Sequence, residues 1–524
     1  MTQDHHTVAI LGAGPAGLTA AYCLQKQDGR YRPVIFEAQH IVGGLSRTEC
    51  LDGYRFDIGG HRFFTKIPEI EAMWREVLGK EMIRVQRQSR IHYRGKFFDY
   101  PLKPLNALRN IGPYETIRIL LSLLKWRVRP SPREDTFTQW VINRFGGRLY
   151  MHFFHSYTLK VWGTQPQEIR ADWAAQRIQN LSLWRAITTS FGGRNKSRSL
   201  IEEFDYPRLG PGQMWEETAQ QVTKAGGELQ LGTEVVKLRR DGMRITEIGT
   251  RPRHAGPDAP ITWAAASHVI SSLDLRTLIR RIDPPPPPEV CAAAEKLRYR
   301  DFLIVTLILD HPDPFPDNWI YVHTDVKVGR IQNFRAWSRD MVPDQHTSSI
   351  GMEYFCQKGD GLWAMPDDEL RALAASELEQ LGLAKANTVI KGAVIRQPKA
   401  YPVYDNEYQK ALSVIRPWLS QLENFQTVGR NGLHRYNNQD HSMLSAMYAV
   451  ENIRGANHDL WNVNVERSYH EEFEVAKPAA AEPDGPAAAP LRPDPGSALG
   501  SQSFPAPGWA KGKDGQVPTA RTVR

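Results

Sequence analysis

The sequence has 524 residues, of which 41% are apolar and 24% charged, and its net charge is +8. This length suits several domains or one elaborated enzyme, and no stretch approaches the roughly 18 apolar residues that a membrane span needs. The arginines are spread along the chain without a nucleic-acid-binding motif, which argues against nucleic acid, and a small anionic substrate fits the positive charge as well.

The N-terminal stretch MTQDHHTVAI has no charged segment followed by an apolar one, so it does not resemble a secretory signal. Four cysteines, Cys23, Cys50, Cys291 and Cys356, stand far apart and form no CxxC pair. We therefore expect a cytoplasmic protein with no disulfide framework and no metal site. Nothing in the sequence indicates the oligomeric state.

Residues 7–60 have the pattern strand, turn, helix, strand. An apolar strand over residues 8–11 leads into Gly12-x-Gly14-x-x-Gly17 and then into a helix. Gly12 permits a tight turn, Gly14 lets the backbone approach a pyrophosphate, and Gly17 allows the helix to pack closely on the strand. Glu37 ends the next strand, twenty residues after Gly17, where an acid can hold ribose hydroxyls. The stretch predicts a dinucleotide site.

Further glycines follow this turn. Gly43 and Gly44 come shortly after Glu37, and Gly59 and Gly60 precede His61 in the stretch DIGGHRFF. Later comes the stretch GTEVVKL, in which we expect the backbone around Val235 and Val236 to border the adenine of the dinucleotide.

The middle of the chain alternates between element types. Residues 104–200 are mostly helical in pattern, residues 227–275 form short strands, and DFLIVTLILD is an apolar strand after the proline run at 284–288. A helix is expected over 366–382 and a strand over 388–396. This order predicts a nucleotide-binding domain whose chain leaves to build a second domain and returns more than once.

A dense polar run, GRNGLHRYNNQDHS, precedes the last predicted helix. Met443, Met447, Val450 and Ile453 recur at helical spacing and predict one buried face. Asp440 or Ser442 is the expected N-cap. From residue 475 onward Ala, Pro, Gly and Ser dominate, and we expect a disordered tail.

The paired glycine turns resemble the flavin amine-oxidase superfamily, in which both turns lie against FAD. More narrowly, DIGGHRFF, KVWGTQPQEIRADWAAQRI, NWIYVHTDVKVGRIQNF and GRNGLHRYNNQDHS resemble UDP-galactopyranose mutases, closest to the eukaryotic-type forms, over roughly residues 7–455. The resemblance implies an α/β protein with a Rossmann-type FAD-binding domain interleaved with a helical domain and an antiparallel-sheet substrate domain.

The expected domains follow this interleaving. The FAD-binding domain takes residues 1–103, 207–283 and 401–474, and its last segment carries a flavin-facing helix. A mainly helical substrate domain takes 104–206, a sheet-containing substrate domain takes 284–400, and the tail takes 475–524.

The resemblance also implies a reaction. Members of the mutase family use reduced FAD to interconvert pyranose and furanose forms of a UDP-sugar through a flavin N5–sugar adduct, with no net redox change. The partner is then a nucleotide-diphosphate sugar, either UDP-galactopyranose or a related one. NAD(P)H is a candidate reductant.

The site residues that the resemblance implies fall into three groups. The catalytic candidates are His61, Arg177 and Arg330, of which the two arginines would hold the departing diphosphate. The further substrate-binding candidates are Arg90, Trp319, Tyr321, Tyr401 and Tyr436; solvated surface and core packing are the alternatives for them. The cofactor-binding candidates are Gly12, Gly14, Gly17, Glu37, Gly43, Gly44, Leu45, Gly60, His61, Val235, Val236, Gly429, Arg430, Asn438, Gln439, Asp440 and Ser442.

Two other functions compete with the mutase. An FAD-dependent oxidoreductase of the amine-oxidase or desaturase kind would act on a small organic substrate and need no grip on a diphosphate. A non-catalytic flavoprotein would keep the FAD motifs and lose the arginines. The presence of Arg177 and Arg330 favours the mutase.

Overall fold

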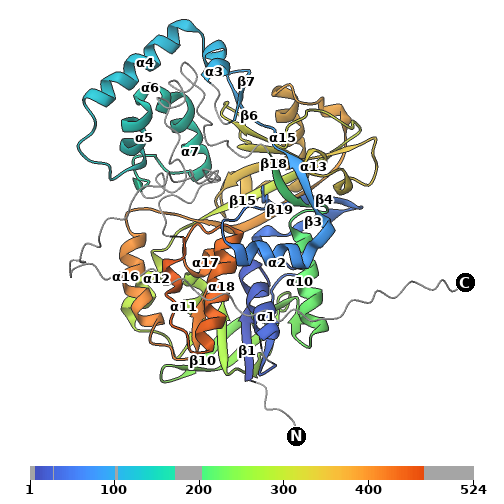
Figure 1. Ribbon diagram of the computed structural model, residues 1–524, viewed down its shortest axis with the longest axis vertical. Coiled ribbons are helices and arrows are strands. Elements are labelled where there is room, and N and C mark those ends of the chain that lie inside the picture. The colour runs from blue at the N-terminus through green and yellow to red at the C-terminus, as the bar shows by residue number, and fades with distance from the viewer. Residues whose placement is uncertain (1–5, 28, 101–103, 172–202, 465–524) are drawn as a thin grey trace, which may run out of the picture. The chain divides into compact units, whose positions relative to one another are not determined.

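The strand β1 (His6–Leu11) is the centre of a five-stranded parallel sheet with the order β20-β13-β1-β2-β9. The structure is a computed structural model and describes residues 6–27, 29–100, 104–171 and 203–464 (Figure 1). Side chains of β1 alternate between two buried faces, as parallel strands covered on both sides require. The other strands of this sheet are β2 (Tyr31–Phe36), β9 (Glu228–Gln230), β13 (His268–Ser271) and β20 (Phe425–Thr427).

Helices cover one face of this sheet. They share one apolar core with Val8 and Ile10 of β1. The predicted apolar face of the last helix is confirmed, because Met443 and Val450 are fully buried and Met447 and Ile453 pack against the same core. The helices are α1 (Pro15–Gln27), α2 (Pro68–Leu78), α10 (Gly212–Lys224) and α18 (Gln439–Ile453).

The opposite face of the parallel sheet packs against a second layer built from a four-stranded sheet in the order β12-β11-β10-β14 and three helices. The strands of this layer are β10 (Thr233–Asp241), β11 (Arg244–Pro252), β12 (Thr262–Ala265) and β14 (Ile282–Asp283). Its helices are α11 (Leu275–Arg281), α12 (Pro288–Glu295) and α16 (Tyr408–Leu419).

A seven-stranded mixed sheet, in the order β19-β15-β18-β17-β16-β6-β7, forms the second large sheet. It combines an early hairpin with strands from much later in the chain, because β6 pairs in parallel with β16. The expected apolar strand is confirmed as β15, and the expected helix and strand near residues 366 and 388 as α15 and β19. The bounds are β6 (Ser89–Tyr93), β7 (Lys96–Asp99), β15 (Tyr299–Leu309), β16 (Trp319–Val322), β17 (Arg330–Asn333), β18 (Ser348–Cys356), β19 (Val389–Pro402) and α15 (Asp367–Gln380).

A helical region follows β7 and packs around its own apolar core, which it shares with Ile91 and Phe98 of the β6–β7 hairpin. Its helices are α3 (Pro104–Ile111), α4 (Pro113–Val128), α5 (Phe137–Phe145), α6 (Gly147–Leu149), a π-helical turn η3 (Tyr150–His155) and α7 (Ser156–Trp162).

Short elements complete the described chain. Two ribbons pair β3 (Thr48–Leu51) with β4 (Tyr54–Asp57) and β5 (Met82–Gln86) with β8 (Glu203–Pro207). The remaining helices and helical turns are α13 (Phe334–Trp337), α14 (Gly361–Ala364), α17 (Gly429–Gly432), η1 (Gly44–Ser46), η2 (Gly79–Glu81), η4 (Arg339–Met341), η5 (Ala386–Thr388) and η6 (Leu460–Asn462).

This architecture confirms the predicted α/β fold, in which a parallel sheet is interleaved with helices and with further sheets. The tail predicted over 475–524 lies outside the described residues. Among the helices that the structure describes, none has the length and apolar character needed to cross a bilayer. The described residues also contain no group of three or more His, Cys, Asp or Glu that could hold a metal ion.

Candidate functional site

Two glycine turns from separate segments meet at the C-terminal end of β1. Gly12 has φ +104°, a backbone conformation that residues with a side chain rarely adopt. Gly17 has no room for a side chain, because a Cβ there would lie 1.9 Å from the Gly12 carbonyl oxygen. The second turn touches the first, since Gly43 donates its N–H to the Ala13 carbonyl at 2.8 Å and a Cβ on Gly44 would lie 3.0 Å from the Cα of Gly14. The two turns form one backbone cradle at the start of α1, which fits the phosphates of a dinucleotide.

Glu37 sits beside this cradle at the end of β2. Its Oε2 accepts the N–H of Ala13 at 2.8 Å, and its Oε1 accepts the N–H of Gln39 at the same distance. A carboxylate has further lone pairs, so Glu37 can accept hydroxyl groups as well. Its role in holding ribose hydroxyls stays a prediction.

Val235 and Val236 lie near the start of β10, which is joined to Glu37 because Thr233 donates its N–H to the Glu37 carbonyl at 2.8 Å. Val235 is buried, and the pairing register between β10 and β11 passes from Val235 directly to Lys237. Val236 is therefore a bulge residue, which leaves its backbone outside the regular ladder. That this backbone borders an adenine stays a prediction.

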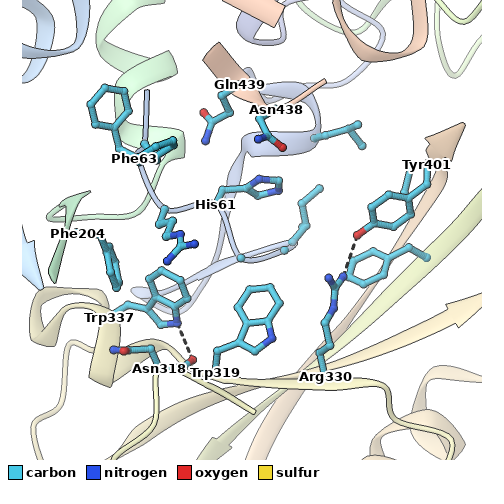
Figure 2. A pocket seen from close by; sticks show the side chains of 18 of the residues that line it. His61, Phe63, Phe204, Asn318, Trp319, Arg330, Trp337, Tyr401, Asn438 and Gln439 are labelled. Carbon is cyan, nitrogen blue, oxygen red and sulfur yellow. Dashed lines mark hydrogen bonds between the residues drawn. The ribbon is translucent and has the colours of Figure 1, made fainter. Parts of the chain in front are cut away.

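A cavity of about 250 Å³ opens between the cradle and the seven-stranded sheet (Figure 2). The loop after β4 forms one wall, the sheet forms the floor, and the N-terminal end of α18 closes another side. Four arginines and a single carboxylate, Asp440, are among the described lining residues. The lining includes Leu45, Gly60, His61, Arg62, Phe63, Arg87, Phe204, Asn318, Trp319, Tyr321, Arg330, Trp337, Gln397, Tyr401, Arg430, Tyr436, Asn438, Gln439 and Asp440.

His61 points into this cavity (Figure 2). Burial, together with the neighbouring Arg430 and Arg330, lowers the pKa of its imidazole to about 3, and a backbone hydrogen bond at Leu45 opposes this shift. His61 is therefore neutral at physiological pH, so it can exchange hydrogen bonds without adding a charge.

Gly60 and Trp319 are in direct contact across the cavity. A Cβ on Gly60 would lie 1.2 Å from Cζ3 of the Trp319 ring. The glycine is required here because the indole lies against the bare backbone. This contact fixes the distance between the loop that carries His61 and the sheet that carries Arg330.

Arg330 begins β17 and is held on two sides. Its Nε lies 2.5 Å from Oε2 of Glu353, a side chain with no exposed surface, and its Nη2 donates to the Tyr401 hydroxyl at 2.8 Å (Figure 2). Its guanidinium lies 5.0 Å from the Trp319 ring centroid and 4.7 Å from that of Phe355. These contacts fix the orientation of a cation at the floor of the cavity.

Tyr401 and Tyr436 stack on each other with ring centroids 5.4 Å apart and an interplanar angle of 15°. Arg430 lies 4.8 Å from the Tyr436 ring, and it donates to the carbonyl oxygens of Asn437 and Ala400. Arg430 thus links the polar stretch before α18 to β19 through hydrogen bonds. The stacked pair of tyrosines lies next to Arg330, which donates to the Tyr401 hydroxyl.

The N-terminal end of α18 faces the cavity with Asn438, Gln439 and Asp440. The expected N-cap at Asp440 or Ser442 is wrong: the helix begins at Gln439, its N-cap is Asn438, and no side chain caps it. The Ser442 hydroxyl instead donates to the Asn438 carbonyl at 2.9 Å, inside the first turn. The N-terminal end of the helix dipole lies at the cavity, which favours negative charge there.

Several predicted residues are gathered around these walls. Leu45, Trp319, Tyr321 and Gln439 line the cavity, and the indole of Trp215 donates to Oε1 of Gln439 at 3.2 Å. Gly429 lies further back, where a Cβ would come within 3.2 Å of the Ala16 methyl group.

Arg90 is not in the cavity, contrary to the prediction. Ser89 pairs with Trp319 and Arg90 with Ile320, so alternation places Arg90 on the opposite face of the sheet from Trp319. There it forms a two-pronged ion pair with the buried Asp317, with Nε 2.7 Å from Oδ1. Arg177, the other predicted arginine, lies outside the described residues.

Several residues that line the cavity are not among the predicted site residues, and three of them, Arg62, Arg87 and Trp337, bear on its charge and shape. Arg87 lines the cavity near the position expected for Arg90. Arg62 follows His61, and burial together with Arg87 lowers its pKa to about 10. Trp337 donates its indole N–H to the Asn318 carbonyl at 2.9 Å. Arg62 is adjacent to a predicted site residue and could have been included, whereas no sequence motif contains Trp337.

The comparison with protein families matches residues 15–405 to the flavin containing amine oxidoreductase model. Among curated proteins, the coproporphyrinogen III oxidase of Staphylococcus aureus (strain NCTC 8325 / PS 47) is 28% identical over 141 residues, which is 25% of this chain and 30% of that protein. The enzyme of the same name from Mycobacterium leprae (strain TN) is 34% identical over 82 residues, or 16% of this chain and 18% of that protein. The chain therefore matches less than a third of the length of these relatives.

Two solved structures are similar over most of the chain. A crystal structure of reduced UDP-galactopyranose mutase has a TM-score of 0.75 at 20% identity and covers 88% of this chain and 98% of its own. The structure of wild-type putrescine oxidase bound to putrescine has a TM-score of 0.56 at 16% identity, and the match covers 86% of this chain and 99% of the oxidase chain. At these identities both likenesses show a shared fold.

Proposed function

This chain belongs to the flavin containing amine oxidoreductase family, and we propose that within it the protein is an FAD-dependent nucleotide-sugar mutase. It interconverts the pyranose and furanose forms of a UDP-sugar, UDP-galactopyranose or a related one, with no net redox change. The cradle of Gly12, Gly14 and Gly44 together with Glu37 would hold the FAD, and the α18 end would face its ring.

The observation that carries the proposal is the setting of Arg330. Its guanidinium is oriented by Glu353 and by Tyr401, and it lies in a cavity where four arginines and a single carboxylate are among the described lining residues. A guanidinium with adjacent tyrosine hydroxyls matches the oxygens of a diphosphate, and its charge does not depend on pH. Such a group stabilises a diphosphate as it leaves an anomeric carbon and holds it for return.

The other cavity residues would orient the sugar and exclude water. Trp319 and Tyr321 offer aromatic walls at 5.8 Å between ring centroids, and Tyr321 also lies 4.8 Å from the ring of Tyr100. His61 is neutral and offers a hydrogen bond beside the cofactor cradle without competing for the anion. When bound, reduced FAD supplies a nucleophilic nitrogen for the anomeric carbon. The resemblance adds Arg177 as a second diphosphate ligand.

The second candidate is an FAD-dependent oxidation of a small organic substrate. The charge of the cavity disfavours a protonated amine, because a cation beside four guanidinium groups is repelled. The same arginines would bind a substrate with several carboxylates, and the curated relatives are coproporphyrinogen III oxidases. An oxidised polycarboxylate is therefore the form of this alternative that the cavity favours.

The deciding experiment incubates the dithionite-reduced protein with UDP-galactopyranose and a panel of other UDP-sugars, and follows the furanose product by chromatography. We expect conversion with reduced protein and none with oxidised protein. A parallel assay measures oxygen consumption by the oxidised protein with coproporphyrinogen III and with putrescine. Oxygen consumption without any furanose product would replace the mutase by an oxidase. Bleaching of the flavin absorbance by NADPH or NADH would identify the reductant.

A further inference from the structure

Helix α4 (Pro113–Val128) carries an unusual concentration of exposed apolar side chains. Six of the ten most exposed large apolar residues in the described part of the chain lie on this one helix. Tyr114 and Val128, at its two ends, are 72% and 70% exposed. In Figure 1 the helix runs along the outer edge of the helical region, with α5 and α6 on its inner side. The six residues are Tyr114, Ile117, Leu120, Leu121, Leu124 and Val128.

These side chains form one continuous stripe. At 3.6 residues per turn they cover an arc of roughly 120° of the helix surface. The residues that attach the helix to the protein are on the other side, where Ile119 and Leu123 are 5% and 6% exposed. The helix is therefore apolar on two faces, and only one of them has a partner in the described chain.

The inner face is held firmly. A Cβ on Gly146 would lie 2.8 Å from the backbone nitrogen of Leu123, so the two backbones are in close contact. Glu115 receives Nη2 of Arg148 at 2.9 Å and faces Nε2 of His152 at 2.8 Å. Because α4 is anchored through these contacts, the outer stripe is a fixed surface feature.

Cations border the stripe on both sides. Arg118 and Lys125 project along one margin and Arg127 along the other, with Arg129 just beyond the end of the helix. All exposed charged residues between positions 113 and 130 are basic. Glu115, the single acid of the helix, is directed to Arg148 and His152, although it also lies 3.6 Å from Arg118.

The apolar stripe of α4 is poorly suited to pairing with the same helix of a second copy of this chain. Positions 114, 117, 121, 124 and 128 have the three-and-four spacing of a coiled-coil seam. The positions that flank such a seam, however, are Arg118, Lys125 and Arg127, so a paired copy would set cation against cation. An anionic bilayer accepts both the apolar stripe and its basic margins.

We propose that the outer face of α4 binds the surface of a membrane containing anionic lipids, with the helix lying in the plane of the interface. Ile117, Leu121 and Leu124 enter the boundary between headgroups and acyl chains, and the flanking arginines and lysine meet lipid phosphates. None of the described helices is able to span a bilayer, so the attachment is peripheral. The inference is independent of the reaction at the cavity.

The test uses the full chain with bound flavin and sucrose-loaded vesicles, either of phosphatidylcholine alone or of phosphatidylcholine and phosphatidylglycerol in equal amounts. We expect sedimentation with the mixed vesicles, weakened by high salt. The double variant Leu121→Gln/Leu124→Gln should lower the partition coefficient by at least about tenfold. Arg118→Gln/Lys125→Gln should remove the preference for phosphatidylglycerol.

The matched control is Ile390→Gln/Val414→Gln, which changes two exposed apolar residues on β19 and α16. It should sediment as the unchanged protein does. Flavin absorbance and melting temperature show that each variant is folded. Absence of sedimentation with either vesicle, or equal sedimentation of the Leu121/Leu124 variant, would overturn the proposal. Light scattering that shows a dimer dissociated by the leucine changes would assign the stripe to a second copy instead.

Discussion

Nε of Arg330 lies 2.5 Å from Oε2 of Glu353, a carboxylate with no exposed surface, beneath the cavity floor. Gln332 donates to the other oxygen of Glu353 at 2.6 Å, so the acid is held from two sides. Burial raises the pKa of Glu353, while the attraction of Arg330 opposes that shift. The ion pair engages Nε of the guanidinium, while Nη2 donates to the Tyr401 hydroxyl on the cavity side.

Replacing Arg330 by lysine tests this geometry. Lysine keeps the charge but cannot reach Glu353 and the Tyr401 hydroxyl together. We expect the dissociation constant for UDP to rise at least about tenfold, or ~1.4 kcal/mol, with unchanged flavin content. Calorimetric titration with UDP measures it. Arg90→Lys is the matched control, because Arg90 is on the opposite face of the sheet and should leave UDP binding unaltered.

Replacing Glu353 by glutamine should destabilise the fold. The variant leaves the Arg330 cation without its buried counter-charge, which costs about 3 kcal/mol of unfolding free energy. Urea titration followed by tryptophan fluorescence gives the value. The control is Glu228→Gln, whose pair with Arg32 is largely exposed at 3.1 Å and should change stability by less than ~1 kcal/mol. Equal effects at both sites would contradict a buried role for Glu353.

Substituting Gly60 by alanine should separate the cofactor loop from the sheet. The new methyl group would overlap Trp319, so the ring or the loop must move, at a cost of about 1–3 kcal/mol. We expect a lower ratio of flavin to protein absorbance after purification. Gly256→Ala is the control, since a Cβ there meets nothing within 4 Å. Full flavin content in Gly60→Ala would show that the contact with Trp319 is dispensable.

Three histidines with lowered pKa values predict how stability depends on pH. Burial lowers the pKa of His61 and His323 to about 3 and that of His434 to about 4. Unfolded histidine has a pKa near 6.5, so between pH 6.5 and 4 the unfolded chain binds more protons than the folded one. The stability contributed by each neutral imidazole is complete above pH 6.5 and is lost as the pH falls below it.

His434 offers the cleanest measurement because it is 1% exposed. Its φ of +43° is one that asparagine tolerates, so His434→Asn keeps the backbone conformation. Unfolding free energies at several pH values between 4.5 and 7 should show a slope smaller by up to about 1.4 kcal/mol per pH unit in the variant. An unchanged slope would mean that His434 titrates alike in both states.

The sequence predicted the parts of the site that local motifs encode. The strand, the Gly12 turn and Glu37 occupy one continuous unit, so their relation follows from short-range geometry. The prediction that Arg90 binds substrate was wrong because strand residues alternate between the two faces of a sheet. A single sequence does not reveal which set of residues faces the cavity when both sets include polar side chains. The pairing of Glu353 with Arg330 could not be predicted from the sequence for a different reason. Glu353 lies within a strand whose nine residues are all buried, and only the antiparallel pairing of β17 with β18 places it opposite Arg330.

The parallel pairing of β6 with β16 has a consequence for how the protein is made. Ser89 pairs with Trp319, and the adjoining contact between Gln88 and Asn318 spans 230 residues. At a synthesis rate of about 5–20 residues per second, the early hairpin emerges from the ribosome roughly 12–46 s before its partner strand exists. During that interval the hairpin presents an unpaired strand edge to the cell. The cavity floor is therefore assembled late in synthesis, and the parallel sheet beside it is completed later still, once β20 and α18 have emerged.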